Sequence, residues 1–257
     1  MEVHAHTHTV DPDGHRGRKK WMHYFWEFLM LFLAVFAGFL AENQREHIVE
    51  HQRAKAYAAN LYEELGKDTT RLNTLIARHT EIAGKLDTFC LLVKGNEMKN
   101  VTSGMLYYYS YYVTKVEYFS SNNTTVEQLK GSGNLRIMGN ELAYRIGEYD
   151  KLNRELEKEY GLSKAEFAKM EDLHFKIFDI YTSENMFSPG PAKEMRDSAF
   201  RMNDLPVKND PELMREYTGW VKFEANIYRF QVKRYLSLLK QSATELLGIL
   251  KREYHLK

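Results

Sequence analysis

The sequence predicts an all-α protein, in which an N-terminal single transmembrane helix is followed by a bundle of three to four long antiparallel helices. Three observations favour this class. The segment 13–188 contains no proline, which is typical of a helix-dominated chain because proline breaks helix interiors. A strongly apolar segment lies near the N-terminus. Beyond it, apolar residues recur at alternating steps of three and four, which is the helical period.

Composition excludes several classes of protein. The 257 residues include 36 Lys and Arg against 35 Asp and Glu, so the chain lacks the overall basic field that attracts nucleic acid. A hydrophobic fraction of 44% argues against a disordered chain. The single cysteine, Cys90, excludes an internal disulfide and a zinc site built from thiolates.

Residues 21–41 form the predicted transmembrane helix, because about 20 apolar residues in a helix cross the roughly 30 Å hydrocarbon core of a bilayer. Trp21, Tyr24 and Trp26 would form an interfacial aromatic belt. Four cations within 16–20 predict, by the positive-inside rule, a single-pass protein whose N-terminus stays in the cytoplasm and whose remaining residues cross the membrane. A cleaved signal peptide and a soluble core helix are the alternatives.

One face of this helix carries a candidate interface. His23, Glu27, Ala34 and Gly38 share a face by their spacing. Ala34 and Gly38 form a small-xxx-small pair, which lets two helices approach closely. The spacing indicates contact with a protein partner or a second copy of the chain, with Glu27 as a polar anchor or protonatable group. The alternative is that Glu27 reaches the lipid headgroups and that the small residues are coincidental.

The N-terminal tail, residues 1–20, is too polar and short to fold alone. His4, His6 and His8 alternate, so an extended chain would place three imidazoles on one side, where zinc, nickel or copper could bind. The alternative is a solvated tail. No cofactor is expected elsewhere.

Residues 42–60 read as a helical stalk, and residues 61–257 as the bundle. A heptad-like seam begins the bundle. It consists of Leu61, Leu65, Asp68, Leu72, Leu75, His79, Ile82, Leu86, Phe89 and Val93. Asp68 and His79 interrupt the apolar pattern, and such polar positions usually set register.

A second helix is expected over 103–119, with unusual aromatic density. We expect one apolar stripe to face the core: Met105, Tyr109, Tyr112, Val116 and Phe119. Tyr107, Tyr111 and Tyr118 lie on another face, where tyrosines suit protein or sugar binding. Burial of that face by neighbouring helices is the favoured alternative.

A third helix is expected over 141–181, with an interruption at 161–163. The segment 183–211 holds four of the five prolines and is expected to be one long irregular loop. The last helix should begin at Pro211 and end near Glu253, because proline is favoured at a first helical turn.

The sequence contains no motif for nucleotide, flavin or haem binding and no hydrolase signature. Cys90 lies beside the seam residue Phe89, which indicates an inert thiol rather than a nucleophile. The chain is therefore not expected to be an enzyme.

Three segments carry a resemblance to a known family. They are MEVHAHTHT (1–9), RKKWMHYFWEFLMLFLAVFAGFLAENQREH (18–47) and FSSNNTTVEQLKGSGNL (119–135). The chain resembles a family of uncharacterised single-pass membrane proteins of Bacteroidetes. The resemblance implies an inner-membrane anchor with a periplasmic helical domain, and it implies no activity or site.

The function expected from the sequence is that of a membrane-anchored periplasmic scaffold or accessory subunit without enzymatic activity. Two alternatives stay open. One is a periplasmic ligand-binding helical bundle that works with a separate signalling partner. The other is a proton-coupled membrane subunit that uses Glu27.

Overall fold

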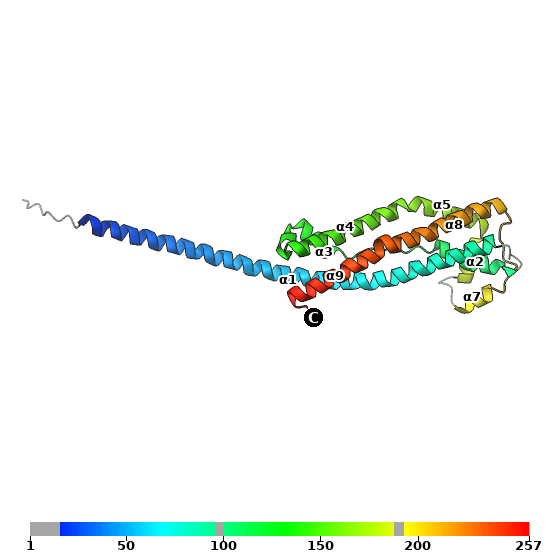
Figure 1. Ribbon diagram of the computed structural model, residues 1–257, viewed down its shortest axis with the longest axis horizontal. Helices are drawn as coiled ribbons and strands as arrows, with labels where there is room; N and C mark the ends of the chain where they lie inside the picture. Colours follow the sequence, from blue (N-terminus) through cyan, green and yellow to red (C-terminus); the bar gives the residue numbers. More distant parts are fainter. Residues whose placement is uncertain (1–15, 96–99, 188–192, 257) are drawn as a thin grey trace, which may run out of the picture. The chain divides into compact units, whose positions relative to one another are not determined.

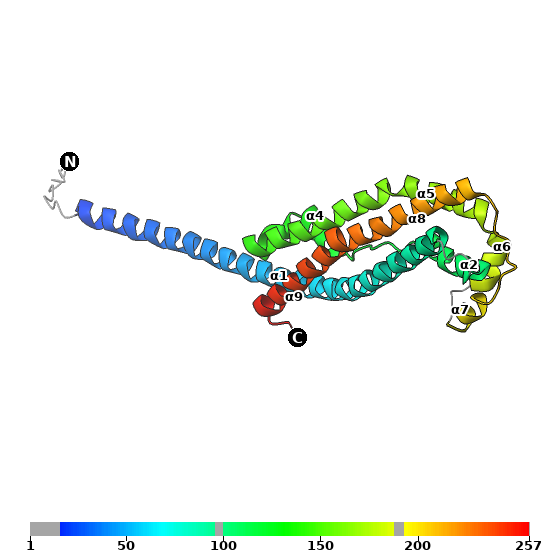
Figure 2. The same ribbon diagram turned by 45° about the vertical axis from the view of Figure 1, so that its right-hand side comes forward.

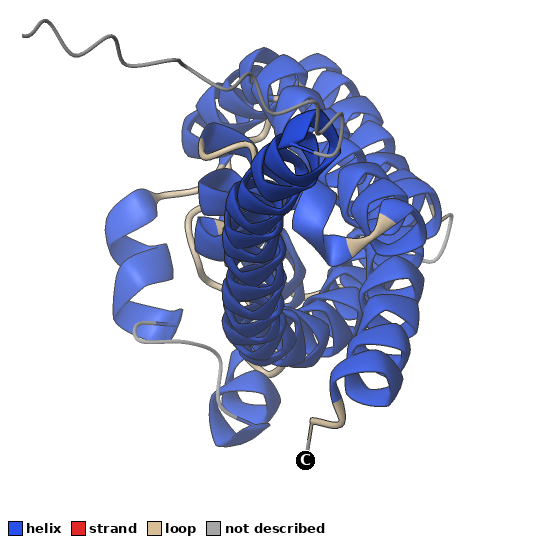
Figure 3. Cartoon of the chain, turned by 90° about the vertical axis from the view of Figure 1, so that its left-hand side faces the viewer, coloured by secondary structure: helices blue, strands red, loops and turns tan. Residues whose placement is uncertain are grey.

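The structure is a computed structural model that describes residues 16–95, 100–187 and 193–256, and its described residues are almost entirely helical, which confirms the all-α class (Figure 1). The helices are α1 (Arg16–Lys94), α2 (Ser103–Tyr111), α3 (Thr124–Gly131), α4 (Asn140–Leu162), α5 (Lys164–Ile177), α6 (Ile180–Phe187), α7 (Lys193–Ala199), α8 (Pro211–Gln231) and α9 (Ser237–Tyr254). Short 3-10 turns lie at Tyr112–Thr114 and Asn134–Met138, and one π-helical turn, Val232–Leu236, joins α8 to α9. Figure 3 shows helices and loops throughout the described chain and no strand.

Two compact units divide the chain between Ala54 and Lys55. In the first unit, the part of α1 over 21–41 exposes all its side chains except Leu29, which is half-buried. This helix is long and apolar enough to cross a membrane. A single candidate span near the N-terminus is therefore confirmed for the described residues.

The second unit contains the bundle. It begins at Lys55, within the segment expected to be a stalk, and Ala58 is already fully buried. All seam residues from Leu61 to Phe89 are buried and Val93 is half-buried. The 3–4 spacing therefore identified the core face of α1 correctly.

Three long rods make this bundle: α1 from Lys55 onward, α4 continued by α5, and α8 continued by α9 (Figures 1 and 2). α4 packs on α9, and α5 packs on α8. The α8–α9 rod runs antiparallel to α1, but the α4–α5 rod runs in the same direction as α1. The expectation that all long helices alternate in direction is wrong for this rod.

The reason lies in the segment after α2. The helix expected over 103–119 ends at Tyr111, and after one 3-10 turn residues 115–123 have no helical structure and return along α1. Backbone groups of this segment bond to side chains of α1: Asp68 accepts from the Asn122 amide, and His79 contacts the Glu117 carbonyl. Polar partners on α1 thus replace the hydrogen bonds that a helix would make.

The interruption expected at 161–163 is present, because α4 ends at Leu162 and α5 begins at Lys164. The expected helix end near Tyr181 is wrong, since α5 ends at Ile177 and a separate helix, α6, follows. The segment 183–211 is not one irregular loop, because it contains the end of α6 and all of α7. α8 begins at Pro211 as expected, with Asp210 accepting a hydrogen bond from the Leu213 amide as its N-cap.

Candidate functional site

The proposed membrane-helix interface lies on one continuous helix. His23, Glu27, Ala34 and Gly38 are all exposed on α1, and no atom of the described chain would meet a Cβ added to Gly38. Their role as an interface stays a prediction. The three candidate metal ligands His4, His6 and His8 lie outside the described residues.

The possible tyrosine surface on the second helix is wrong at two of its three positions, where the favoured alternative, burial, is confirmed. Tyr107 is fully buried, its hydroxyl donates to the Pro206 carbonyl at 2.5 Å, and it accepts from the Asp179 amide at 2.9 Å. Tyr111 is also buried, with its hydroxyl 3.3 Å from the Phe187 carbonyl. These tyrosines anchor α2 to the chain segments that cover it.

Tyr118, the third member of that set, is 44% exposed and packs edge-on against Tyr160 with ring centroids 4.7 Å apart. Met105 and Tyr109, which were expected to face the core, are only half-buried. The packing alternative is therefore the one the structure shows for Tyr107 and Tyr111. Of the expected stripe, Tyr112 and Phe119 are buried as predicted, whereas Met105, Tyr109 and Val116 are not.

Asp68 holds three segments together. The carboxylate is fully buried and accepts from the Asn122 amide at 2.9 Å, from Asn122 Nδ2 at 2.6 Å and from the Tyr149 hydroxyl at 2.7 Å. One turn earlier, Glu64 accepts from the amide of Thr125 at 3.2 Å and from its hydroxyl at 2.9 Å, at the start of α3. Both carboxylates position the chain rather than form a reactive site.

His79 lies in a second polar patch of the core. Its Nε2 is 3.0 Å from the Glu117 carbonyl and therefore donates to it. Its Nδ1 is buried and has no hydrogen-bond partner among the described residues. The imidazole meets the Tyr228 ring edge-on at 4.7 Å, and burial lowers the pKa of His79.

Glu224 of α8 is a buried acid of the bundle. This burial, together with the charge of Glu166 on α5, raises its pKa to about 7. Glu166 Oε2 is also buried and has no hydrogen-bond partner in the described chain. Burial is the larger cause of the raised pKa of Glu224, because a poorly solvated site disfavours the ionised carboxylate.

The sequence does contain a signal for Glu224. Tyr217, Val221, Glu224 and Tyr228 follow the 3–4 spacing of a buried helix face, and all four are buried. A carboxylate at such a position is the same signal that singled out Asp68 on α1. Glu166 carries no comparable signal.

The described residues contain no group of three or more His, Cys, Asp and Glu side chains arranged to hold a metal ion. His174 is buried, and its Nδ1 lies 2.9 Å from the Tyr217 hydroxyl; burial lowers its pKa to about 4. Cys90 is buried, and burial raises the pKa of its thiol. These groups are neutral and enclosed at neutral pH, which suits packing more than catalysis.

A partly exposed aromatic face, which sequence inspection missed, runs along α8; two of its members, Trp220 and Ile227, are half-buried. Trp220, Phe223, Ile227 and Phe230 follow a 3–4–3 spacing and so share one side of the helix. Phe223 is 44% exposed and Phe230 is 45% exposed. Trp220 packs edge-on against Phe223 at 5.7 Å, which fixes these rings in place.

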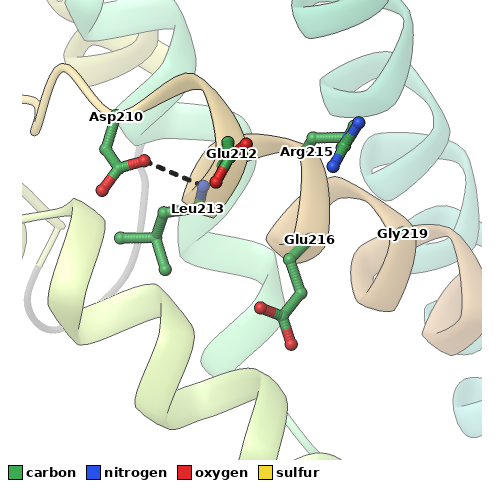
Figure 4. A pocket seen from close by; sticks show the side chains of 6 residues that line it. All are labelled: Asp210, Glu212, Leu213, Arg215, Glu216 and Gly219. Carbon is green, nitrogen blue, oxygen red and sulfur yellow. Dashed lines mark hydrogen bonds between the residues drawn. The ribbon is translucent and has the colours of Figure 1, made fainter.

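Two hollows flank the start of α8. The first, of about 630 Å³, is bordered by charged side chains of the first turns of α8, including Glu212, Arg215 and Glu216 (Figure 4). The second, of about 530 Å³, is lined by apolar, polar and charged side chains from the end of α1, from α2, from the segment 207–210 and from α8.

No family model, curated protein or solved structure matches this chain. The class of protein is therefore defined by the fold alone: an all-α protein with one N-terminal helix long and apolar enough to span a membrane.

Proposed function

We propose that this chain is a membrane-anchored accessory or scaffold protein without enzymatic activity. Residues 21–41 anchor it in the inner (plasma) membrane, its N-terminus lies in the cytoplasm, and its helical bundle lies in the periplasm. The four cations within 16–20 and the uncovered apolar side chains of 21–41 support this arrangement.

The observation that carries the proposal is the aromatic face of α8. Large aromatic rings that stay exposed on a folded helix are characteristic of protein-interaction surfaces, because they supply apolar area at low entropic cost. Lys169 lies over the Trp220 ring at 4.8 Å and pairs with Glu216 at 3.4 Å. Charged groups thus border the rings, as they do at the rim of many interfaces.

Photo-cross-linking in native membranes tests this proposal. We expect p-benzoylphenylalanine placed at Phe223 or at Phe230 to give the same discrete adduct. The exposed position Lys251 on α9 is the matched control and should give none. Absence of an adduct at both α8 positions, or the same adducts at all three positions, would contradict the proposal.

The span supplies a second contact in this proposal. Ala34 and Gly38 leave room for a neighbouring helix, and Glu27 on the same face supplies a polar group for it. We expect Gly38→Ile to reduce energy transfer between differently labelled copies, or between chain and partner, in liposomes. Val35→Ile on another face is the control. Undiminished energy transfer in Gly38→Ile would show that this face of the span does not contribute to the interface.

A further inference from the structure

The apolar cavity beside α8 is lined by three parts of the bundle. Val93 and Lys94 come from the last turn of α1, Leu106 comes from α2, and Met214 comes from the first turns of α8. Val207 to Pro211, the stretch that leads into α8, closes another side. Its volume of about 530 Å³ falls within the range of small-molecule sites.

The polar atoms at the base of this cavity are already satisfied. Thr218, which is buried there, donates its hydroxyl to the Met214 carbonyl at 2.7 Å. The Thr218 carbonyl in turn accepts from Cys90 Sγ at 3.6 Å. An aliphatic chain that fills the cavity would therefore leave none of these groups unpaired, and its burial would be favourable.

Positive charge predominates at the cavity's edge. Lys94, Lys208 and Arg215 are exposed there, against the single carboxylate of Asp210. That carboxylate accepts from the Leu213 amide at 3.0 Å and lies 3.8 Å from Lys208 Nζ. Within the described ranges, neither Lys94 nor Arg215 forms an ion pair.

Of the acids near Arg215 on α8, Glu216 is paired elsewhere, whereas Glu212 borders the neighbouring hollow together with Arg215. Figure 4 shows the side chains of Arg215 and Glu216 leaving different sides of the helix, and Glu216 pairs with Lys169. The N-terminus of α8 adds partial positive charge to the same region. An apolar interior with three cations and one carboxylate at its rim is complementary to a molecule with a hydrocarbon chain and one acidic end.

We propose that this cavity binds a medium-chain aliphatic carboxylate. The chain lies among Val93, Leu106 and Met214, and the carboxylate lies between Lys94 and Arg215. The site uses none of the aromatic residues of the α8 face. A test of carboxylate binding is therefore independent of a test of the proposed function.

Calorimetric titration of the full-length chain in phosphatidylcholine nanodiscs tests the proposal, with empty nanodiscs as the blank. The probes are octanoate, 1-octanol and octyltrimethylammonium. We expect octanoate to bind at least about tenfold more tightly than octyltrimethylammonium. From hexanoate to decanoate, affinity should rise about fourfold per methylene group, the value expected for a buried CH₂. Equal binding of the three octyl probes, or no binding, would overturn the proposal.

Variants locate the site. Arg215→Gln and Lys94→Gln should each weaken octanoate binding about fivefold and leave 1-octanol binding unchanged, because each removes one exposed charge contact. Lys251→Gln, a charge removed from α9, is the matched control. Leu106→Trp should block both probes by filling the cavity, and its thermal unfolding curve shows whether the variant is folded.

Cross-linking gives an independent readout that does not need any variant. A decanoic acid with a diazirine near its methyl end should label peptides containing Val93, Leu106 or Met214. Labelling confined to other parts of the chain, or an octanoate affinity that falls as much in Lys251→Gln as in Arg215→Gln, would contradict the proposed site.

Discussion

The hydroxyl group of Tyr149 on α4 donates a 2.7 Å hydrogen bond to the carboxylate of Asp68 on α1. The same carboxylate holds the amide of Asn122, in the segment that returns along α1. Because Asp68 is fully buried, these donors replace the water that a carboxylate otherwise requires. The Asp68 contacts lie near the point where the returning segment leads into the α4–α5 rod. They therefore help to explain why α4 runs parallel to α1.

We expect Asp68→Ala to lower the free energy of unfolding of the bundle by about 3 kcal/mol, because it leaves the buried Tyr149 hydroxyl and the Asn122 amide without their acceptor. Tyr149→Phe should cost about half of that, since Asp68 keeps its contacts with Asn122. Urea unfolding followed by circular dichroism measures both. A double variant whose loss equals the sum of the single losses would show that the two side chains are not coupled.

A close backbone approach joins α2 to the end of α7. A Cβ added at Gly104 would lie 1.8 Å from the Ala199 carbonyl oxygen, and the Gly104 amide donates to the Met202 carbonyl at 3.0 Å. Only glycine fits this contact.

Gly104→Ala should therefore destabilise the bundle by about 2 to 4 kcal/mol, because the obstructing atoms belong to the backbone and cannot rotate away. Gly147→Ala is the matched control: it lies inside α4 with no atom near its added Cβ, so it should stabilise by about 0.5 to 1 kcal/mol. Thermal unfolding compares the two variants. A neutral Gly104→Ala would mean that α7 does not rest against α2.

The seam of α1 could be predicted from the sequence because its burial follows from local spacing. Leu61, Leu75 and Phe89 are separated by whole heptad steps, and the helix places all three on one side. Asp68 and His79 were recognised on the same ground. Their partners, Tyr149 and the Glu117 carbonyl, lie in other segments of the chain. Local sequence spacing cannot predict such partners.

The orientation of α2 could not be predicted in this way. Tyrosines occupy several faces of 103–112, so apolar periodicity does not select one of them. Burial of Tyr107 and Tyr111 is decided by Pro206 and Phe187, which lie 99 and 76 residues further along the chain. The aromatic face of α8 was missed for the converse reason, since the same 3–4 spacing describes a buried face and an exposed one.

Glu224 should make the bundle less stable as pH rises. Its folded pKa of about 7 lies above the ordinary value of 4.5, so the folded state holds a proton that the unfolded state releases. Stability from this group is complete below pH 4.5 and is lost as pH rises towards and through 7, by about 3 kcal/mol in all. Glu224→Gln should remove this loss, which urea unfolding at pH 5 and pH 8 measures. An unchanged difference between the two pH values would show that Glu224 ionises normally.

His174 acts in the opposite direction. Its pKa falls from 6.5 to about 4 on burial, so the folded state excludes a proton that the unfolded state binds. Its contribution is complete above pH 6.5 and is lost as pH falls towards and through 4, again by about 3 kcal/mol. His174→Gln should reduce the loss of unfolding free energy at acid pH. Glu224→Gln should reduce the loss as pH rises through 7. If the free energy of unfolding of His174→Gln falls as steeply at acid pH as that of the unaltered chain, other groups cause the fall.

Cys90 offers a direct probe of these effects, because it is the single cysteine of the chain. It is only 6% exposed, its thiol lies against the Thr218 carbonyl, and burial raises its pKa. Since the thiolate is the reactive form, we expect labelling by a maleimide at pH 7 to be at least about a hundredfold slower in the folded chain than in urea. If labelling requires the bundle to open, Asp68→Ala and Gly104→Ala should raise the logarithm of the labelling rate in proportion to their loss of stability. Fast labelling of the unaltered folded chain would instead show that solvent reaches the α1–α8 contact without unfolding.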